Sequence, residues 1–240
     1  MQKTLNRSVR LVTMDLDRLK KIQEELARSV VIKDFIKSGN LRFVLGVDQS
    51  FIGKKQEKVI SACVALTFPE LKPIDQNVRI EDVHFPYIPT FLMFREGDPA
   101  VRTIEPIVKK LDKSRTVIMV DGSGIAHPRR CGLATYIALK LEVPSIGITK
   151  RKLYGDVEYP EREMEAKPIF DGDEIIGYAL KPCKACKPIF ISPGSYITPK
   201  TALEIVKACI KSHKLPEPIR LAHELATRSK SQSLSFFMEL

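Results

Sequence analysis

The centre of this chain reads Val117-Ile-Met-Val-Asp-Gly-Ser-Gly-Ile-Ala-His-Pro-Arg-Arg-Cys-Gly132. Its first four residues are apolar and are typical of a buried strand, which ends in the carboxylate of Asp121. The loop that follows holds glycines, an imidazole and two guanidinium groups, a composition that suits chemistry on an anion. Val44-Leu-Gly-Val-Asp48 repeats the strand-then-acid arrangement upstream. Two such strands, if they are neighbours, bring two carboxylates to one edge of a sheet.

The composition indicates one globular domain with a basic surface. At 240 residues, 44% of them hydrophobic, the chain is long enough to bury a substantial core. The net charge of +10 favours a polyanionic partner, of which nucleic acid is the commonest. No apolar run is long enough to cross a membrane, and the first residues contain no apolar signal core. We therefore expect a soluble, intracellular protein located in the cytoplasm, with no membrane contact.

Cysteine usage argues against a disulfide framework, because five cysteines are an odd number in a chain without a secretion signal. Cys183-Lys-Ala-Cys186 and the Cys209/His213 pair together resemble zinc-ligand spacing. The separation between the two pairs is unusual for zinc, and Cys209 lies in apolar surroundings. A structural role for Cys209 is the simpler interpretation, and the zinc site remains an alternative.

Hydrophobic periodicity predicts alternating elements along most of the chain. Two prolines make Phe85-Pro-Tyr-Ile-Pro89 a stiff loop. Asp98-Pro99 is typical of a helix start, and so is Thr198-Pro199. The pattern predicts helices at 14–30, 98–111, 133–141, 198–213 and 217–227, and strands at 41–51, 59–68, 78–84, 116–121, 144–148, 172–180 and 187–192.

A meander of strands followed by alternating helices and strands predicts an α/β fold: a mixed β-sheet flanked by helices on both faces. We expect a single catalytic domain over residues 1–228 and a polar C-terminal tail over 229–240.

Three acids are candidates for a metal site. Asp48 and Asp121 end predicted strands, and Glu96 lies between the proline loop and the expected helix start. Mg²⁺ prefers oxygen ligands, and two such ions about 4 Å apart can clamp the attacking and leaving oxygens of a phosphodiester. Taken singly, each acid is most simply an ion-paired cap or a turn residue. Two acids at the ends of buried strands weigh against that interpretation.

With these residues in place, the chain resembles the endonuclease V family, deoxyinosine-specific nucleases with a ribonuclease H-like fold. The resemblance runs from about residue 14 to 227 and rests on several motifs in the same order. They are Gly46-Val-Asp-Gln-Ser50, Pro86-Tyr-Ile-Pro89 with Phe94-Arg-Glu96, Asp121-Gly-Ser-Gly-Ile-Ala-His-Pro-Arg129 with Gly132-Leu-Ala134, Ile146-Gly-Ile-Thr-Lys150, and Arg220-Leu-Ala-His223.

The resemblance implies a catalytic set. Asp48 and Asp121 would bind the catalytic Mg²⁺, with Glu96 in or beside the coordination shell; Mn²⁺ can substitute. Lys150 would face the scissile phosphate and stabilise developing negative charge. His223 would sit near the same centre and position a ligand or handle a proton.

The resemblance also implies how the lesion is recognised. Tyr87 would belong to a wedge that parts the strands, and the extruded base would enter a pocket near Gly122, where a backbone amide can approach it. His127 would orient a carboxylate or contact the substrate. The expected substrate-contacting residues are Tyr87, Pro89, Thr90, Leu92, Gly122, His127 and Arg129.

Two positions depart from the family pattern. Thr90 stands where the wedge motif usually has glycine, and threonine adds bulk and prefers negative φ. We therefore expect an altered wedge. Ser195 stands where the family often has histidine, and no role is carried over to it.

The resemblance thus implies an Mg²⁺-dependent DNA repair endonuclease that nicks DNA at the second phosphodiester bond 3′ to deoxyinosine. An inosine-specific endoribonuclease is the close alternative, because contacts to a 2′-hydroxyl cannot be read from a sequence. A non-catalytic nucleic-acid-binding protein on the same fold is a third hypothesis, which the presence of all three acids disfavours.

The last residues suggest one further partner. Gln232, Leu234, Phe236 and Phe237 occur in the order of a sliding-clamp-binding box, although the leucine is one residue too close to the aromatic pair. The alternative is a frayed end that packs its aromatic rings on the body of the protein. We expect the protein itself to be a monomer.

Overall fold

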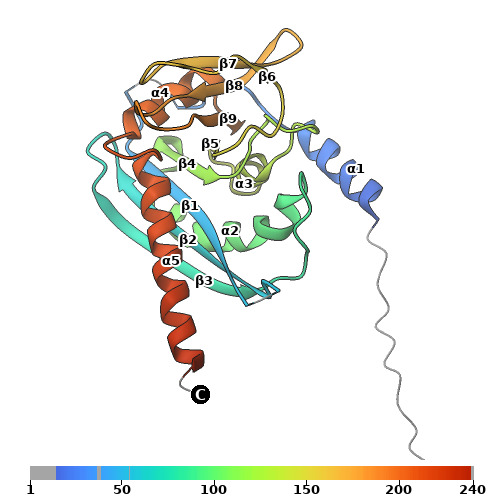
Figure 1. Cartoon of the computed structure of the whole chain (residues 1–240), viewed down its shortest axis with the longest axis vertical. Coiled ribbons are helices and arrows are strands. Elements are labelled where there is room, and N and C mark those ends of the chain that lie inside the picture. The colour runs from blue at the N-terminus through green and yellow to red at the C-terminus, as the bar shows by residue number, and fades with distance from the viewer. Residues whose placement is uncertain (1–14, 37–38, 54, 239–240) are drawn as a thin grey trace, which may run out of the picture.

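The computed structural model describes residues 15–36, 39–53 and 55–238, with side chains described up to residue 233. In this part of the chain, a nine-stranded sheet has the order β3-β2-β1-β4-β5-β9-β8-β7-β6 (Figure 1). The helices are α1 (Leu16–Ala27), α2 (Leu92–Val108), α3 (Leu133–Leu141), α4 (Pro199–Cys209) and α5 (Glu217–Met238), with a short 3₁₀ turn at Lys113–Arg115. The strands are β1 (Phe43–Ile52), β2 (Lys58–Thr67), β3 (Pro73–Asp82), β4 (Thr116–Asp121), β5 (Ser145–Thr149), β6 (Asp156–Val157), β7 (Ala166–Asp171), β8 (Glu174–Leu180) and β9 (Ile189–Ser195).

The sheet is mixed, as the sequence predicts. The strand β1 pairs antiparallel with β2 and parallel with β4, and β4 pairs parallel with β5. The remaining strand pairs are antiparallel. In the β1–β4 register Val47 lies opposite Val120, so the next residue of each strand, Asp48 and Asp121, occupies neighbouring positions.

Helices cover both faces of the sheet, which explains the continuous apolar run of β4. Successive side chains of a strand point to opposite faces. Val117 and Met119 belong to the core cluster shared with α4 and α5, whereas Ile118 and Val120 belong to the cluster shared with α2 and α3. A strand buried on both faces needs apolar residues at every position.

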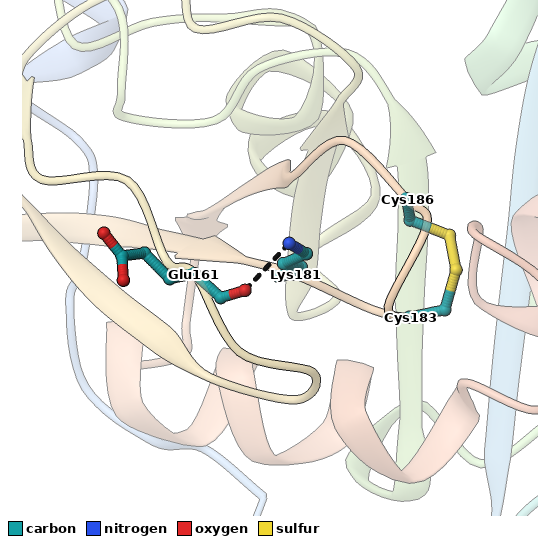
Figure 2. The surroundings of a disulfide bond; sticks show 4 residues. All are labelled: Glu161, Lys181, Cys183 and Cys186. Carbon is teal, nitrogen blue, oxygen red and sulfur yellow. Dashed lines mark hydrogen bonds between the residues drawn. A yellow bond between two sulfur atoms is a disulfide. The ribbon is translucent and has the colours of Figure 1, made fainter.

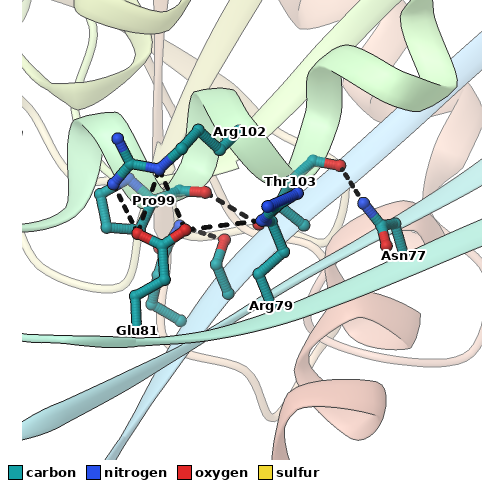
Figure 3. A network of polar contacts seen from close by, with 8 residues as sticks. Asn77, Arg79, Glu81, Pro99, Arg102 and Thr103 are labelled. Atoms are coloured by element: carbon teal, nitrogen blue, oxygen red, sulfur yellow. Dashed lines mark hydrogen bonds and ion pairs between the residues drawn. The ribbon is translucent and has the colours of Figure 1, made fainter.

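The helix α2 corrects one prediction. It begins at Leu92, not at Asp98, so Pro99 lies inside it together with Pro106. Each proline removes a helical amide, but the chain around them is held from β3 (Figure 3). Thr103 Oγ1 donates to the Pro99 carbonyl at 2.8 Å, and Asn77 Nδ2 donates to the Thr103 carbonyl at 2.9 Å.

The same face of α2 is fixed by charge. Arg102 Nε donates to both carboxylate oxygens of Glu81 at 3.0 and 3.1 Å, and Arg79 adds an ion pair to Glu81 at 3.5 Å. Figure 3 shows this network between the helix and β3. Tertiary contacts therefore override the proline signal that the sequence analysis took for a helix start.

Two further predictions need correction. β6 and β7 are absent from the predicted elements; β7 contains Pro168, which argues against a strand, but it lies beside the two-residue edge strand β6. The last helix runs to Met238 and includes most of the segment 229–240 that was expected to be a polar tail. No helix in the described ranges combines the length and apolarity needed to cross a membrane.

The loop between β8 and β9 contains a disulfide that the sequence analysis did not anticipate. Cys183 and Cys186 are bonded to one another, beside Lys181, whose Nζ donates to the Glu161 carbonyl at 2.8 Å (Figure 2). Both sulfurs are therefore engaged, and Cys209 is a buried core residue. These contacts favour the structural interpretation of Cys209 over the zinc alternative.

Close packing of α5 against β1 generates a stability prediction. A Cβ atom on Gly46 would lie 2.0 Å from the carbonyl oxygen of Pro218. We expect Gly46→Ala to lower the free energy of unfolding by about 3 kcal/mol, measured by denaturant titration, because backbone must move to admit the methyl group.

Gly172→Ala is the matched control. Its Cβ would meet nothing within 4 Å, and its φ of +60° leaves only the strain of a left-handed alanine, about 1 kcal/mol. Equal losses for the two variants would contradict the packing argument.

Candidate active site

The structure brings the two strand-end acids together as predicted. Asp48 lies within β1 and is buried, and Asp121 closes the neighbouring parallel strand β4. Glu96 is also buried, but it lies in the second turn of α2 and not in a loop before the helix. The acids thus come from two strands and the helix that packs above them.

Hydrogen bonds fix the carboxylate of Asp48 at both oxygens. The backbone N–H of Gln49 donates to Oδ1 at 2.8 Å, and His223 Nδ1 lies 2.6 Å from Oδ2. His223 projects from α5, and its side chain is half exposed. The histidine that the sequence placed near this centre is therefore in direct contact with a predicted ligand.

The three acids are close enough for their negative charges to raise the pKa values of Asp48 and Glu96. Burial, followed by the charge of Asp121, raises the pKa of Asp48 to about 6, although the bond from His223 opposes this rise. Burial, followed by the charge of Asp48, raises the pKa of Glu96 to about 8. Carboxylates crowded in this way are destabilised as anions, and a bound cation would relieve their repulsion.

This donor set fits a magnesium ion in its chemistry. Across the residues that the structure describes, no three His, Cys, Asp or Glu side chains converge into a ready-made metal cage. Mg²⁺ seldom needs such a cage, because it retains waters and commonly binds through one or two carboxylates plus substrate phosphate. The Asp48/Asp121 pair, with Glu96 behind it, is suited to that mode of binding.

Lys150 contacts the second acid. It follows the end of β5, and its Nζ lies 2.9 Å from Asp121 Oδ2. Burial alone would lower the pKa of Lys150, but the charge and hydrogen bond of Asp121 raise it above its ordinary value. The lysine is therefore a persistent cation beside the carboxylate pair.

Lys214 lies within electrostatic range of Lys150 and of a third lysine, Lys187. The pKa of Lys214 is lowered by partial burial and by the charges of Lys150 and Lys187. Lys187 follows the disulfide loop, and Lys214 lies between α4 and α5, so three segments far apart in the chain supply these cations. Like charges that act on one another, one of them bonded to Asp121, favour a surface for an anion. The sequence analysis missed Lys187 and Lys214, because only the fold brings them together.

The proline loop has the exposed aromatic tip that the wedge role requires. Tyr87 is 66% exposed, whereas Leu92 is half-buried at the start of α2. Thr90 has a φ of +68°, the left-handed conformation that glycine adopts without strain. Thr90 is therefore held in a conformation that suits glycine better than threonine.

His127 and Arg129 lie behind this loop, and both form hydrogen bonds with Thr90. His127 Nε2 donates to the Thr90 carbonyl at 2.9 Å, while its Nδ1 accepts the backbone N–H of Arg129 at 3.2 Å. Burial lowers the pKa of His127 to about 4, so the ring is neutral. Arg129 Nη2 donates to the carbonyl and the hydroxyl of Thr90, at 2.8 and 2.7 Å.

Gly122 and Ser195 both take part in structural hydrogen bonds. The amide of Gly122 donates to the carbonyl of Ile148 at 3.1 Å, and a Cβ there would lie 3.0 Å from Leu133. Its value to a base pocket would be the missing side chain, not its own N–H. The hydroxyl of Ser195 accepts the amide of Val31 at 3.0 Å, a structural bond.

Gln23 is a further residue that was not predicted from the sequence. It is completely buried and donates to the carbonyl of Thr90, beside the proline loop. A signal existed: Gln23 follows Leu19 by four residues and precedes Leu26 by three, so it lies on the apolar face of α1. A polar residue on such a face needs buried partners.

Comparisons with known proteins agree with this geometry. The family model of endonuclease V matches residues 24–224. The curated endonuclease V of Archaeoglobus fulgidus is 56% identical over 222 residues, covering 92% of this chain and 96% of the relative.

Solved structures agree as well. The catalytic domain of human endonuclease V is 26% identical and superposes with a TM-score of 0.81, covering 92% of this chain and 97% of that one. Endonuclease V of Ciona intestinalis, solved in complex with a 24mer DNA that contains an inosine followed by a ribo-adenosine, is 26% identical with a TM-score of 0.77, covering 90% and 98%.

These matches confirm the ribonuclease H-like mixed sheet with helices on both faces. Together with the strand-end acids and their lysine neighbours, they show that the chain is an endonuclease that belongs to the endonuclease V family.

Proposed function

We propose that this endonuclease acts on DNA containing deoxyinosine and nicks it at the second phosphodiester bond 3′ to the lesion, with Mg²⁺ or, in its place, Mn²⁺. The observation that carries the proposal is the pair of carboxylates on adjacent parallel strands, with Lys150 bonded to one of them. The inosine-containing DNA in the Ciona complex supports the choice of substrate.

Each residue at the centre has a distinct task in the proposed reaction. Asp48 and Asp121 would hold the metal, with Glu96 completing the negative site. When bound, Mg²⁺ neutralises phosphate charge and lowers the pKa of a water. Lys150, released in part from Asp121, would stabilise charge that develops on the phosphate oxygens. His223 would orient Asp48 through their hydrogen bond and handle a proton at Nδ1 or Nε2.

Lesion recognition would use the loop above the acids. Tyr87 would separate the strands, and Pro89, Thr90, Leu92 and Gly122 would line the space for the extruded base. His127 and Arg129 would shape that pocket through Thr90. Extruding a base costs a few kcal/mol, and least for a mispaired one, which favours inosine over normal pairs.

A ribonuclease acting on inosine in RNA is the second candidate. The Ciona complex favours it to the extent that a ribonucleotide directly follows the inosine in that DNA. A non-catalytic role is not favoured, because all three acids and Lys150 are present at the site.

We also propose that the protein is a cytoplasmic monomer and that its last segment binds a sliding clamp. Gln232 is exposed on α5, while the side chains of Leu234, Phe236 and Phe237 lie outside the described residues. Removing 229–240 should abolish clamp binding and leave nicking intact.

The direct test of the substrate uses matched oligonucleotides. With Mg²⁺, we expect nicking of inosine-containing duplex DNA at the second bond 3′ to the lesion and no nicking of the undamaged duplex, read on a sequencing gel. Uracil, abasic and mismatched duplexes define the lesion range. Cleavage of inosine RNA at a far higher rate than inosine DNA would favour the ribonuclease instead.

The acids can be tested separately. Asp121→Asn and Asp48→Asn should each reduce the rate of nicking by about 100-fold or more, because they remove charge that the reaction needs, while DNA binding is retained. Asp75→Asn, a surface acid paired with Lys110, serves as the control. Normal turnover by either active-site variant at saturating Mg²⁺ would eliminate the proposed metal site.

The lysine group predicts a change in salt dependence. The double variant Lys187→Gln/Lys214→Gln should bind DNA more weakly and show a slope of log K against log [salt] that is shallower by about 1 to 2. Lys20→Gln/Lys109→Gln, which removes two exposed lysines paired with Asp17 and Glu105, is the charge-matched control. An unchanged slope in the double variant would show that these lysines do not contact the phosphates.

A further inference from the structure

The carbonyl group of Thr90 is the most heavily bonded acceptor around the proline loop. It accepts from Gln23 Nε2 at 3.0 Å, His127 Nε2 at 2.9 Å and Arg129 Nη2 at 2.8 Å. A carbonyl oxygen has two lone pairs, so three donors saturate it. Such bonding is typical of backbone held in one conformation, here at a φ of +68°.

The hydroxyl of Thr90 adds a contact that glycine could not make. Its Oγ1 accepts from Arg129 Nη2 at 2.7 Å, and the guanidinium lies 4.5 Å from the ring centroid of Phe91, the next residue. The threonine side chain, which departs from the family pattern, thus adds a hydrogen bond to Arg129, the same residue that bonds to the Thr90 carbonyl.

Gln23 connects this cluster to the N-terminal helix. Its Oε1 accepts from Arg129 Nε at 2.7 Å, and its Nε2 also donates to the carbonyl of Cys131 at 3.0 Å. It is the one fully buried residue of α1, whose apolar side chains are partly or largely exposed. A buried amide with three partners fixes the guanidinium of Arg129 more firmly than a surface contact could.

The opposite end of the loop is held in a similar way. Arg95 on α2 donates from Nη1 to the carbonyl of Phe85 at 2.8 Å and from Nη2 to Gln56 Oε1 at 2.8 Å, and it lies 4.3 Å from the ring centroid of Phe51. Both ends of the loop are therefore held by guanidinium contacts, one from the buried Arg95 and one from the partly buried Arg129. Tyr87 projects between them, 66% exposed.

We propose that Gln23 and the hydroxyl of Thr90 are positioning residues that hold the proline loop, which carries Tyr87, rigid for duplex substrates. Parting a duplex requires that unstacking and unpairing be offset by contacts with a loop that does not yield. A single strand has no partner strand to separate, so its inosine reaches the acids without this rigidity. The inference rests on the proposed function for its substrate.

The test compares duplex and single-stranded inosine DNA. Gln23→Leu, which keeps the volume of the side chain, should reduce kcat/KM on the duplex by about tenfold and change it by less than about twofold on the single strand. Thr90→Ala should also reduce the duplex activity, and Thr90→Ser, which keeps the hydroxyl, should restore it. Because Thr90 also lines the proposed base pocket, the comparison with single-stranded DNA is made with Gln23→Leu. Glu25→Ala, an exposed change on α1, is the control.

Hydrogen exchange of the 85–94 segment provides a readout that does not depend on the substrate. Its amides should exchange faster in Gln23→Leu and Thr90→Ala than in the wild type or Glu25→Ala. Unchanged exchange in both variants, or equal losses of activity on duplex and single strand for Gln23→Leu, would overturn the positioning role. Wild-type protein that cuts neither inosine substrate would instead remove the proposed function, while the exchange data would still decide whether the loop is held by these residues.

Discussion

The parallel register between β1 and β4 is the constraint on which the site depends. It sets Asp48 beside Asp121, in a part of the sheet that is covered on both faces. Burial and mutual repulsion then raise the pKa values of Asp48 and Glu96. Other groups at the site offset this negative charge: Lys150 pairs with Asp121, and His223 bonds to Asp48. A bound divalent cation would offset it further.

Packing around the sheet delivers these partners. Gly46 lets the start of α5 approach β1 without a gap, and the same helix carries His223 to the carboxylate of Asp48. The interior contacts of α2 and β3 hold the helix that carries both Glu96 and Arg95. Arg95 in turn fixes one end of the proline loop, so one helix positions both Glu96 and this loop.

The sequence predicted the core of this arrangement because its signals are local. An unbroken apolar run followed by an acid identifies β4, and α3 has the predicted bounds, Leu133–Leu141. Predictions were wrong where tertiary contacts outweigh local preference. Pro99 was taken for a helix start, yet Thr103 and Asn77 support the chain around it. Gln23 was not singled out, although it is buried and bonds to a distant loop. Lys187 and Lys214 meet only after folding, and no spacing in the sequence reveals them.

The central claim is that Asp48 and Asp121 bind a divalent cation together with the substrate phosphate. Electron paramagnetic resonance titration of Mn²⁺, with and without an uncleavable phosphorothioate DNA containing inosine, tests it most directly. We expect the DNA to tighten Mn²⁺ binding to the wild-type protein and Asp121→Asn to remove this gain. Equal Mn²⁺ affinity in the wild type and the variant, with the DNA bound to both, would contradict it.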